Sequence, residues 1–332
     1  QQQAPILVDP AEAGWQVKPT LMFMMNASMK TRRTANELEA EGYTLMGNRY
    51  IAGEQQWLPF YEGKMVGAYD HRAASIIFEE SNRVRRNQPV DTIISEHEDP
   101  EHAVLPMFWL DSVVVKERCG EVPRWCLVVK DVTSATNERT AISAVLPSSA
   151  LSDSLPWLSN QRGACVNACL LANLNTFVLD YVARQKVAGL HLRGHYLSQL
   201  PIFAPDVYSN ICSWAHSDYA AWFVPRVMEL TYTAWDMHSF ACDCGYDGPP
   251  FRWNENRRFL LRCEIDAAFF QLYGITRDDV GYIMETFPIV KRKDEAQYGE
   301  FRTKRVILGI YDAMAEAIRT GIPYQTILDP LP

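Results

Sequence analysis

The stretch "ACVNACLLANLNTFVLDYVARQKV", residues 164–187, does most to decide the fold. Apolar side chains recur along it at i, i+3 and i+4, from Val166 and Cys169 to Val178. This period is typical of a helix with a broad apolar face. We therefore predict one buried helix over these residues, ended by Gly189.

The sequence before this helix predicts short strands. The run SVVVKE and the run WCLVVKDV flank a connection that contains Gly120 and Pro123, which is typical of a hairpin. Gly42 is expected to stop a short helix that precedes a further strand. The expected elements are a helix at 34–43 and strands at 43–51, 112–117, 125–132 and 141–147.

The sequence after this helix returns to the helical period. Helices are expected within 217–240, within 254–273 and at 300–320, together with a shorter helix that Thr276 and Asp279 cap and that stops before Pro288. The charged run 291–305 is expected to be a solvated helix face. We predict an α+β fold, with a strand-containing recognition domain at 1–205 followed by a mainly helical domain at 206–332.

Composition limits the classes of protein that need to be considered. The 332 residues are 48% hydrophobic and carry a net charge of −8, with eight acids between Asp91 and Glu121. Acidity argues against non-specific nucleic-acid binding, but it does not exclude a local phosphate-binding face, because salt screens charges beyond about 10 Å. No apolar stretch is long enough to span a bilayer, so we predict a cytoplasmic protein. The chain starts with Gln, and we expect it to be a fragment or processed product.

Common catalytic and cofactor signatures are missing from the sequence. It contains neither G-x-G-x-x-G nor a P-loop, and neither G-x-S-x-G nor H-E-x-x-H. The eight cysteines form no C-x-x-C pair, and Cys242 with Cys244 is the one pair to check for a metal. We predict no catalytic, cofactor or metal residue here, and the lack of a ligand cluster counts against a nuclease or zinc enzyme.

Three polar segments carry donors that suit an anionic backbone: EGKMVGAYDHR (62–72), KDVTSATNERT (130–140) and ARQKVAGLHLRGHYLSQLP (183–201). Each also has a purely structural interpretation. The first is compatible with a salt-bridged turn, the second with turn capping by hydroxyl and amide groups, and the third with cations at a helix C-terminus.

Several segments, in this order, resemble one family. LPFYEGKMVGAYDHR is similar to the segment that follows the catalytic domain in large bacterial adenine-N6 DNA methyltransferases. These include type IIG and type ISP restriction-modification enzymes and the methyltransferases of BREX and DISARM phage-defence systems. KDVTSATNERTAISAVLP and LLANLNTFVLDYVARQKVAGLHLRGHYLSQLPIF resemble the family's next blocks. CEIDAAFFQLYGITRDDVGYIMETFP and KDEAQYGEFRTKRVILGIYD resemble its C-terminal helices.

The resemblance implies a target-recognition region that reads double-stranded DNA for a catalytic domain in cis or in trans. The family's Asn-Pro-Pro-aromatic motif is absent, and NQPV at 87–90 is no substitute. S-adenosylmethionine therefore belongs to a missing catalytic half or to a partner chain. Phosphate contacts are expected from Lys64, His71, Arg72, Arg139, Lys186 and Arg193, and base-edge or groove contacts from Asn137, Gln185 and His191, with Thr140 completing the DNA-binding set. Leu190 and the Arg193-Gly194 pair depart from the family pattern, which puts in doubt what this loop reads.

A second hypothesis comes from another class of function. The acidic stretch 91–121 and the tryptophans Trp214, Trp222 and Trp235 are compatible with a subunit that docks on other proteins of a defence complex. Tryptophans at helical spacing are also typical of a core.

Overall fold

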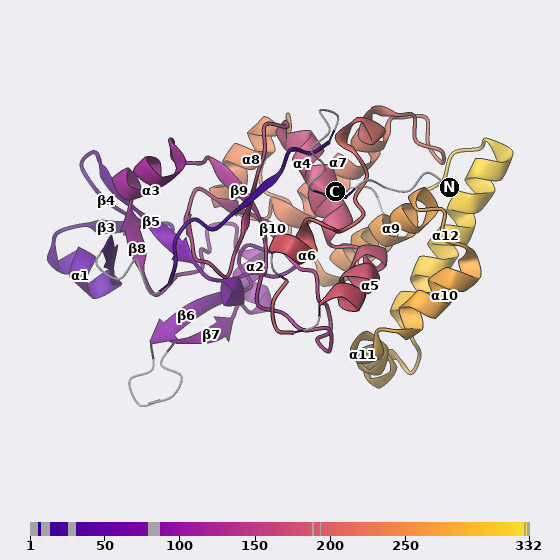
Figure 1. The fold of residues 1–332 in the computed structure, drawn as a ribbon, viewed down its shortest axis with the longest axis horizontal. Coiled ribbons are helices and arrows are strands. Elements are labelled where there is room, and N and C mark those ends of the chain that lie inside the picture. Colours follow the sequence, from indigo (N-terminus) through magenta and orange to yellow (C-terminus); the bar gives the residue numbers. More distant parts are fainter. Residues whose placement is uncertain are drawn as a thin grey trace.

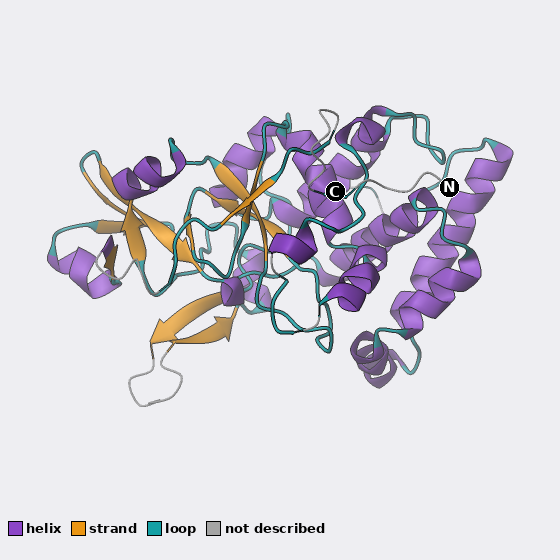
Figure 2. Cartoon of the chain, in the orientation of Figure 1, coloured by secondary structure: helices purple, strands orange, loops and turns teal. Residues whose placement is uncertain are grey.

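The computed structural model has an α+β fold (Figures 1 and 2). It describes residues 6–7, 14–25, 31–78, 87–187, 189–192, 194–328 and 330. Strands gather toward one end of the molecule, and the helices within residues 255–320 lie at the other (Figures 1 and 2). Within the described residues, no single helix has both the length and the apolar composition needed to cross a membrane.

The strands form three sheets. One has the order β1-β12-β9-β10, and the largest has the order β2-β8-β5-β4-β3 with β11 parallel to β5. Strands β6 and β7 form a separate hairpin that projects from the body (Figure 1). The bounds are β1 Lys18–Thr20, β2 Arg32–Arg33, β3 Thr44–Met46, β4 Arg49–Ala52, β5 Gln55–Tyr61, β6 Ala74–Phe78, β7 Asn87–Asp91, β8 Trp109–Asp111, β9 Trp125–Val129, β10 Ser143–Pro147, β11 Ala150–Leu151 and β12 Trp157–Ser159.

The strand predicted at 112–117 is wrong, because this run is helix α3 (Ser112–Cys119). Asp111 caps the helix by accepting a hydrogen bond from the Val113 amide, and Gly120 ends it at a positive φ of 85°. Capping here outweighs the β preference of three consecutive valines. The strands predicted at 125–132 and 141–147 are confirmed, and β9 pairs with β10.

Two further N-terminal elements also differ in detail from the prediction. The helix expected at 34–43 is confirmed as α1 (Ala35–Ala40), which Thr34 and Glu37 cap reciprocally. The strand expected at 43–51 is instead two strands, β3 and β4, which pair antiparallel. Gly47 sits between them at a φ of 61°, a conformation that glycine adopts readily.

The single helix predicted over 164–187 is also wrong, since it is two helices, α4 (Ala164–Leu174) and α5 (Phe177–Lys186), bent by 64°. Asn175 leaves the helical path and its side chain bonds the backbone N–H and C=O of Ser143 in β10. Thr176 then caps α5 by accepting from the Leu179 amide. Both helices are buried, so the apolar pattern continues unbroken through the bend.

The helices predicted in the C-terminal part are confirmed. Thr276 caps α10 through the Asp279 amide, and Gly321 ends α12 at a φ of 73°. Helix α11 was not predicted as a separate element. The remaining elements are η2 Gly63–Met65, α2 Ile94–Glu98, α6 Gly194–Leu197, η3 Pro205–Ser209, α7 Tyr219–Thr231, η4 Trp235–Met237, α8 His238–Asp243, α9 Glu255–Leu272, α10 Arg277–Glu285, α11 Pro288–Tyr298 and α12 Arg302–Thr320.

The largest apolar core contains side chains from both sides of residue 205, including Leu127, Leu170, Phe223 and Phe269. A second core lies among β5, β9 and β10. The division into domains at 205/206 stays a prediction, and this shared core fixes the sheet containing β9 against the helices that follow it.

Candidate nucleic-acid interface

Arg72, expected to contact phosphate, is fully buried. Its Nη1 donates to the carbonyl oxygens of Asp99 and His102, both at 2.9 Å. Its Nη2 donates to the carbonyls of His97 at 3.0 Å and Thr233 at 3.1 Å. The DNA-contact prediction for Arg72 is therefore corrected: in this structure its Nη1 and Nη2 donors are used inside the protein, and its Nε is buried.

His71 also lies in the interior, against expectation. Its Nε2 is 2.9 Å from Asp236 Oδ1, and a parallel pair places His97 Nε2 3.1 Å from Asp70 Oδ2. Burial pushes the pKa of Asp70 upward, but the hydrogen bond and charge of His97, together with the charges of Arg258 and His71, bring the pKa below its ordinary value. Burial also raises the pKa of Asp236, and the charge and hydrogen bond of His71, with the charges of Arg72 and Arg49, lower it below its ordinary value.

Lys64 is the one cation of this stretch that reaches the surface, with 30% of its side chain exposed. Its Nζ lies 3.1 Å from Glu62 Oε2 and donates to the carbonyl of Asn87, at the start of β7, at 3.0 Å. The residue ties the η2 turn to the projecting hairpin and keeps part of its charge accessible. Residues 62–72 are mainly an internal support.

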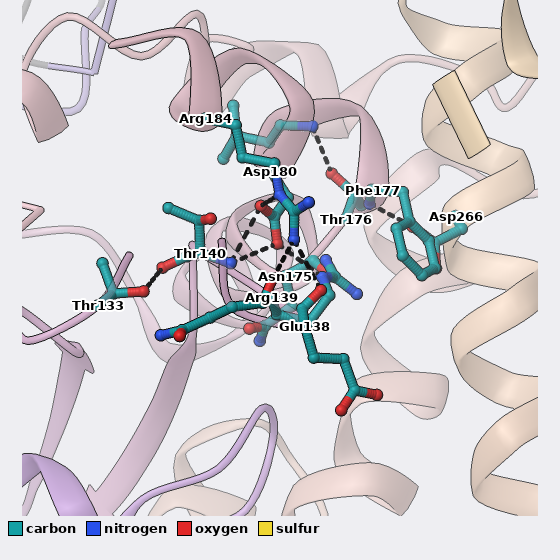
Figure 3. A network of polar contacts seen from close by, with 12 residues as sticks. Thr133, Glu138, Arg139, Thr140, Asn175, Thr176, Phe177, Asp180, Arg184 and Asp266 are labelled. Carbon is teal, nitrogen blue, oxygen red and sulfur yellow. Dashed lines mark hydrogen bonds and ion pairs between the residues drawn. The ribbon is translucent and has the colours of Figure 1, made fainter. Parts of the chain in front are cut away.

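Asp180 organises the second and third segments (Figure 3). Its buried carboxylate accepts from Arg139 Nε at 2.6 Å, from Arg184 Nε at 3.1 Å and from the Thr140 amide at 3.0 Å. Arg139 Nη2 also donates to the carbonyl of Asn175 at 2.5 Å. We call Arg139, Thr140, Asn175, Asp180 and Arg184 the Asp180 cluster.

The predicted DNA contacts of Thr140 and Arg139 are also corrected, because both residues belong to this buried cluster. Thr140 is fully buried, and its hydroxyl donates to the carbonyl of Ser134. Arg139 is mostly buried, and its guanidinium stacks on Phe177 at 4.1 Å. Sequence reasoning missed Asp180, although an acid four residues before Arg184 on an apolar helix was a usable signal.

Arg184 fastens the loop of residues 131–140 to helix α5. Its Nη2 donates to the carbonyls of Asn137 and Glu138, both at 2.7 Å, and its guanidinium stacks on Phe287 at 4.1 Å. Carbonyls held by a charged donor give a loop little freedom to move. The position of Asn137 is therefore fixed by the helix that also carries Gln185.

The same loop pairs with the chain that follows α5. The Thr133 amide donates to the carbonyl of Leu190 at 2.9 Å, and the Leu192 amide donates to the carbonyl of Asp131 at 2.7 Å. His191 Nδ1 lies 2.7 Å from Asp131 Oδ2, with 41% of the His191 side chain exposed. Two segments about sixty residues apart in sequence thus lie side by side.

Four of the predicted contacts stay accessible on these paired segments. Asn137 and Gln185 are exposed, and Lys186 and His191 are partly exposed. Across the described parts of the chain, the side chains of Asn137, Gln185 and Lys186 make no hydrogen bond or ion pair. We call Asn137, Gln185, Lys186 and His191 the exposed set. Arg193 lies outside the described residues.

The two cysteines considered for metal binding, Cys242 and Cys244, have different neighbours. Cys242 Sγ lies 3.3 Å from His238 Nε2, whereas Cys244 packs against the main core and its carbonyl accepts from Cys165 Sγ at 3.6 Å. Over the ranges that the structure describes, no group of three or more His, Cys, Asp or Glu side chains is placed to hold a metal ion.

No protein-family model, no curated protein and no solved structure matches this chain.

Proposed function

We propose that this chain is the DNA target-recognition part of a bacterial adenine-N6 methyltransferase system of the restriction-modification or phage-defence kind. The catalytic domain and its S-adenosylmethionine lie on the N-terminal side or on a partner chain. The proposal places the protein in the cytoplasm, with duplex DNA as its ligand. It rests on the order of the family-like segments and on how they pack.

One observation carries the proposal: the separate family-like segments build a single scaffold. The Tyr69 amide donates to the carbonyl of Ser143 at 3.1 Å, and the Tyr69 hydroxyl donates to the carbonyl of Ala172 at 3.2 Å. The turn of residues 67–70 is thereby held to both β10 and α4. Segments that are similar to one family in sequence order are also neighbours in space.

The packing divides the predicted contacts into two roles. Arg72, His71, Arg139 and Thr140 support the scaffold, while Lys64 and the exposed set are left for DNA. An exposed ammonium suits phosphate, and amide or imidazole groups suit base edges. Asn137, Gln185 and Lys186 can exchange water for DNA without breaking an internal bond of the described residues, which the buried side chains cannot do.

Salt-dependent binding tests this proposal. Fluorescence anisotropy with a labelled random duplex should give an affinity that falls with salt, and Lys186→Ala should flatten the slope by about one unit. Lys116→Ala is the matched control, because Lys116 is an exposed lysine on α3 within the acidic stretch. Equal slopes for the wild type and Lys186→Ala would remove Lys186 from the interface.

A protein-docking surface remains the second candidate, favoured by the exposed apolar side chains of Trp235, Ile93 and Ile94. Trp235 is 43% exposed, and its amide donates to the carbonyl of Pro100 in the acidic stretch. Ile93 and Ile94, which precede Pro100 by a few residues in the sequence, are exposed as well. Trp214 and Trp222 are buried and no longer contribute to this candidate. Failure of the wild-type chain to bind any duplex at low salt would favour docking.

A further inference from the structure

A cavity of about 500 Å³ opens between the Asp180 cluster and the C-terminal helices. Its walls come from the 67–70 turn, the 138–139 loop, the start of α5 and helices α9, α11 and α12. Aromatic rings of Phe177, Phe259 and Tyr298 line it together with charged side chains. This size and mixture are typical of a site for a small organic ligand.

Most of the charges that line the cavity already have protein partners. Lys293 pairs with Glu138, and Asp294 accepts from the Thr303 amide at 2.6 Å in the first turn of α12. The Glu255 carboxylate accepts from the Trp253 indole at 2.5 Å, and Arg139 is held by Asp180. These groups define the walls, and they are not free for a ligand.

Arg262 and Asp266 can still form hydrogen bonds to a ligand. Arg262 lines the cavity, and its guanidinium makes no hydrogen bond or ion pair within the described ranges. Asp266 is only 4% exposed, and its Oδ1 accepts from the Phe177 amide at 2.7 Å (Figure 3). Its other carboxyl oxygen has no partner among those residues. Because Asp266 lines the cavity, this second oxygen can accept from or donate to a ligand there.

Arg302 adds a second, oriented cation. Its guanidinium lies 4.2 Å from the Phe259 ring and 4.6 Å from the Tyr298 ring, and Nη2 donates to Asn256 Oδ1 at 2.6 Å. The two rings and the amide fix its position without neutralising its charge. Among the described residues, neither the Arg262 nor the Arg302 guanidinium is hydrogen-bonded to a carboxylate, and Asp266 uses one of its two carboxyl oxygens.

We propose that this cavity binds a single nucleotide, with the phosphate at Arg262 and Arg302 and the base hydrogen-bonded to Asp266. A purely cationic ligand would meet the two arginines, and a simple anion would leave Asp266 without a partner. Burial raises the pKa of Asp266 to about 7, against the opposing charge of Arg139, so near neutrality the carboxyl can donate as well as accept. A base edge, which presents both donors and acceptors, matches such a group better than an ammonium does.

The nucleotide has two sources with the same chemistry. It is either a free mononucleotide or an unpaired nucleotide of the DNA that the chain is proposed to bind. The loop that carries Glu138 and Arg139 in the cavity wall also carries Asn137 of the exposed set, which makes the second source reachable.

Calorimetry of the whole chain with adenosine, guanosine, cytidine and thymidine 5′-monophosphates tests the site. At least one should bind, and Arg262→Gln should weaken it about tenfold or more. Arg292→Gln is the matched control, because Arg292 is exposed on α11 and does not line the cavity, and it should leave binding unchanged. Asp266→Asn, which keeps an acceptor for the Phe177 amide, should change the preference among the four bases.

Duplexes with and without one unpaired nucleotide distinguish the sources. Tighter binding to the unpaired duplex, abolished by Arg262→Gln but not by Arg292→Gln, assigns the site to DNA. Mononucleotide binding without that preference assigns it to free nucleotides. If neither occurs, the proposal is overturned, and paired-duplex binding unaffected by Arg262→Gln would leave the proposed DNA function standing. Mononucleotide binding without any duplex binding would instead support the nucleotide site and overturn the proposed DNA function.

Discussion

Arg72 and the Asp180 cluster are two solutions for an arginine in the interior. Arg72 is surrounded by neutral carbonyl oxygens, and the carboxylates of Asp70 and Asp236 pair with histidines beside it. Arg139 and Arg184 instead share one buried carboxylate directly. The first arrangement depends on backbone from distant segments, and the second on a single side chain. In both, a cation whose residue type suits phosphate instead holds segments of the chain together.

The largest expected effect is that of removing the Arg72 guanidinium. Arg72→Met removes the guanidinium donor of the carbonyl oxygens of His97, His102 and Thr233. The carbonyl of Asp99 still accepts from the His102 amide, and each buried unsatisfied group costs about 1–3 kcal/mol. We expect the free energy of unfolding, measured in urea, to fall by about 5 kcal/mol. Arg305→Met, at an exposed arginine paired with Glu300, is the control and should leave the free energy of unfolding nearly unchanged. Similar values for both variants would contradict the structural role of Arg72.

The Asp266 carboxyl in the cavity and the Asp70 and Asp236 carboxylates beside Arg72 should give opposite dependences of stability on pH. Burial raises the pKa of Asp266 from 3.8 to about 7, so between these values the folded state binds more protons than the unfolded state. Stability from this group therefore falls as pH rises from 4 to 7, by at most about 4 kcal/mol. Asp266→Asn should flatten the fall in urea unfolding measured across this range.

Asp70 and Asp236 should act in the other direction. Their pKa values are lowered in the folded state, so their contribution is present above pH 3.8 and is lost as pH falls through the folded pKa. Asp236→Asn should reduce the loss of stability below pH 4. If Asp266→Asn also changed only that acid range, its raised pKa would be contradicted.

Removing the shared carboxylate should have a smaller effect than removing Arg72. Asp180→Asn leaves two mostly buried arginines without their counter-charge, and breaking such a buried pair costs about 3 kcal/mol. The loop of residues 131–140 should also lose protection from amide exchange. Asp312→Asn, which breaks the exposed pair with Arg277, is the control and should cost less than about 1 kcal/mol.

The smallest expected change in the free energy of unfolding is that of His191→Ala, which is best compared with His71→Ala. His191→Ala breaks a half-exposed pair and should cost less than about 1 kcal/mol, whereas His71→Ala breaks a buried one and should cost more. DNA affinity should show the reverse order once both variants are compared at a temperature where they are folded. Weaker DNA binding by His71→Ala alone would contradict the division of roles.

Local signals in the sequence predicted local structure. Thr34 with Glu37, Thr276 with Asp279 and the glycine after α12 mark helix ends that the structure confirms. The break between α4 and α5 was not predictable in this way, because Asn175 leaves the helix to bond Ser143, and that contact joins segments 32 residues apart. At 112–117, the β preference of the valines predicted a strand, but the run forms a helix that Asp111 caps.

The candidate site was predictable only in part. EGKMVGAYDHR is polar enough to suggest a surface, yet the donors of Arg72 meet backbone from residues 97–102 and from Thr233, 161 positions away. No local pattern shows such partners. By contrast, Gln185 and Lys186 end an amphipathic helix, and their accessibility agrees with the period of the apolar residues before them.

Amide hydrogen exchange of the whole chain, with and without a saturating DNA duplex, tests the central claim most directly. The division of roles predicts that DNA slows exchange in residues 131–140 and 183–192 and leaves residues 69–72, around the buried His71 and Arg72, unchanged. Slower exchange confined to 69–72, with no change around Asn137 and Gln185, would contradict it.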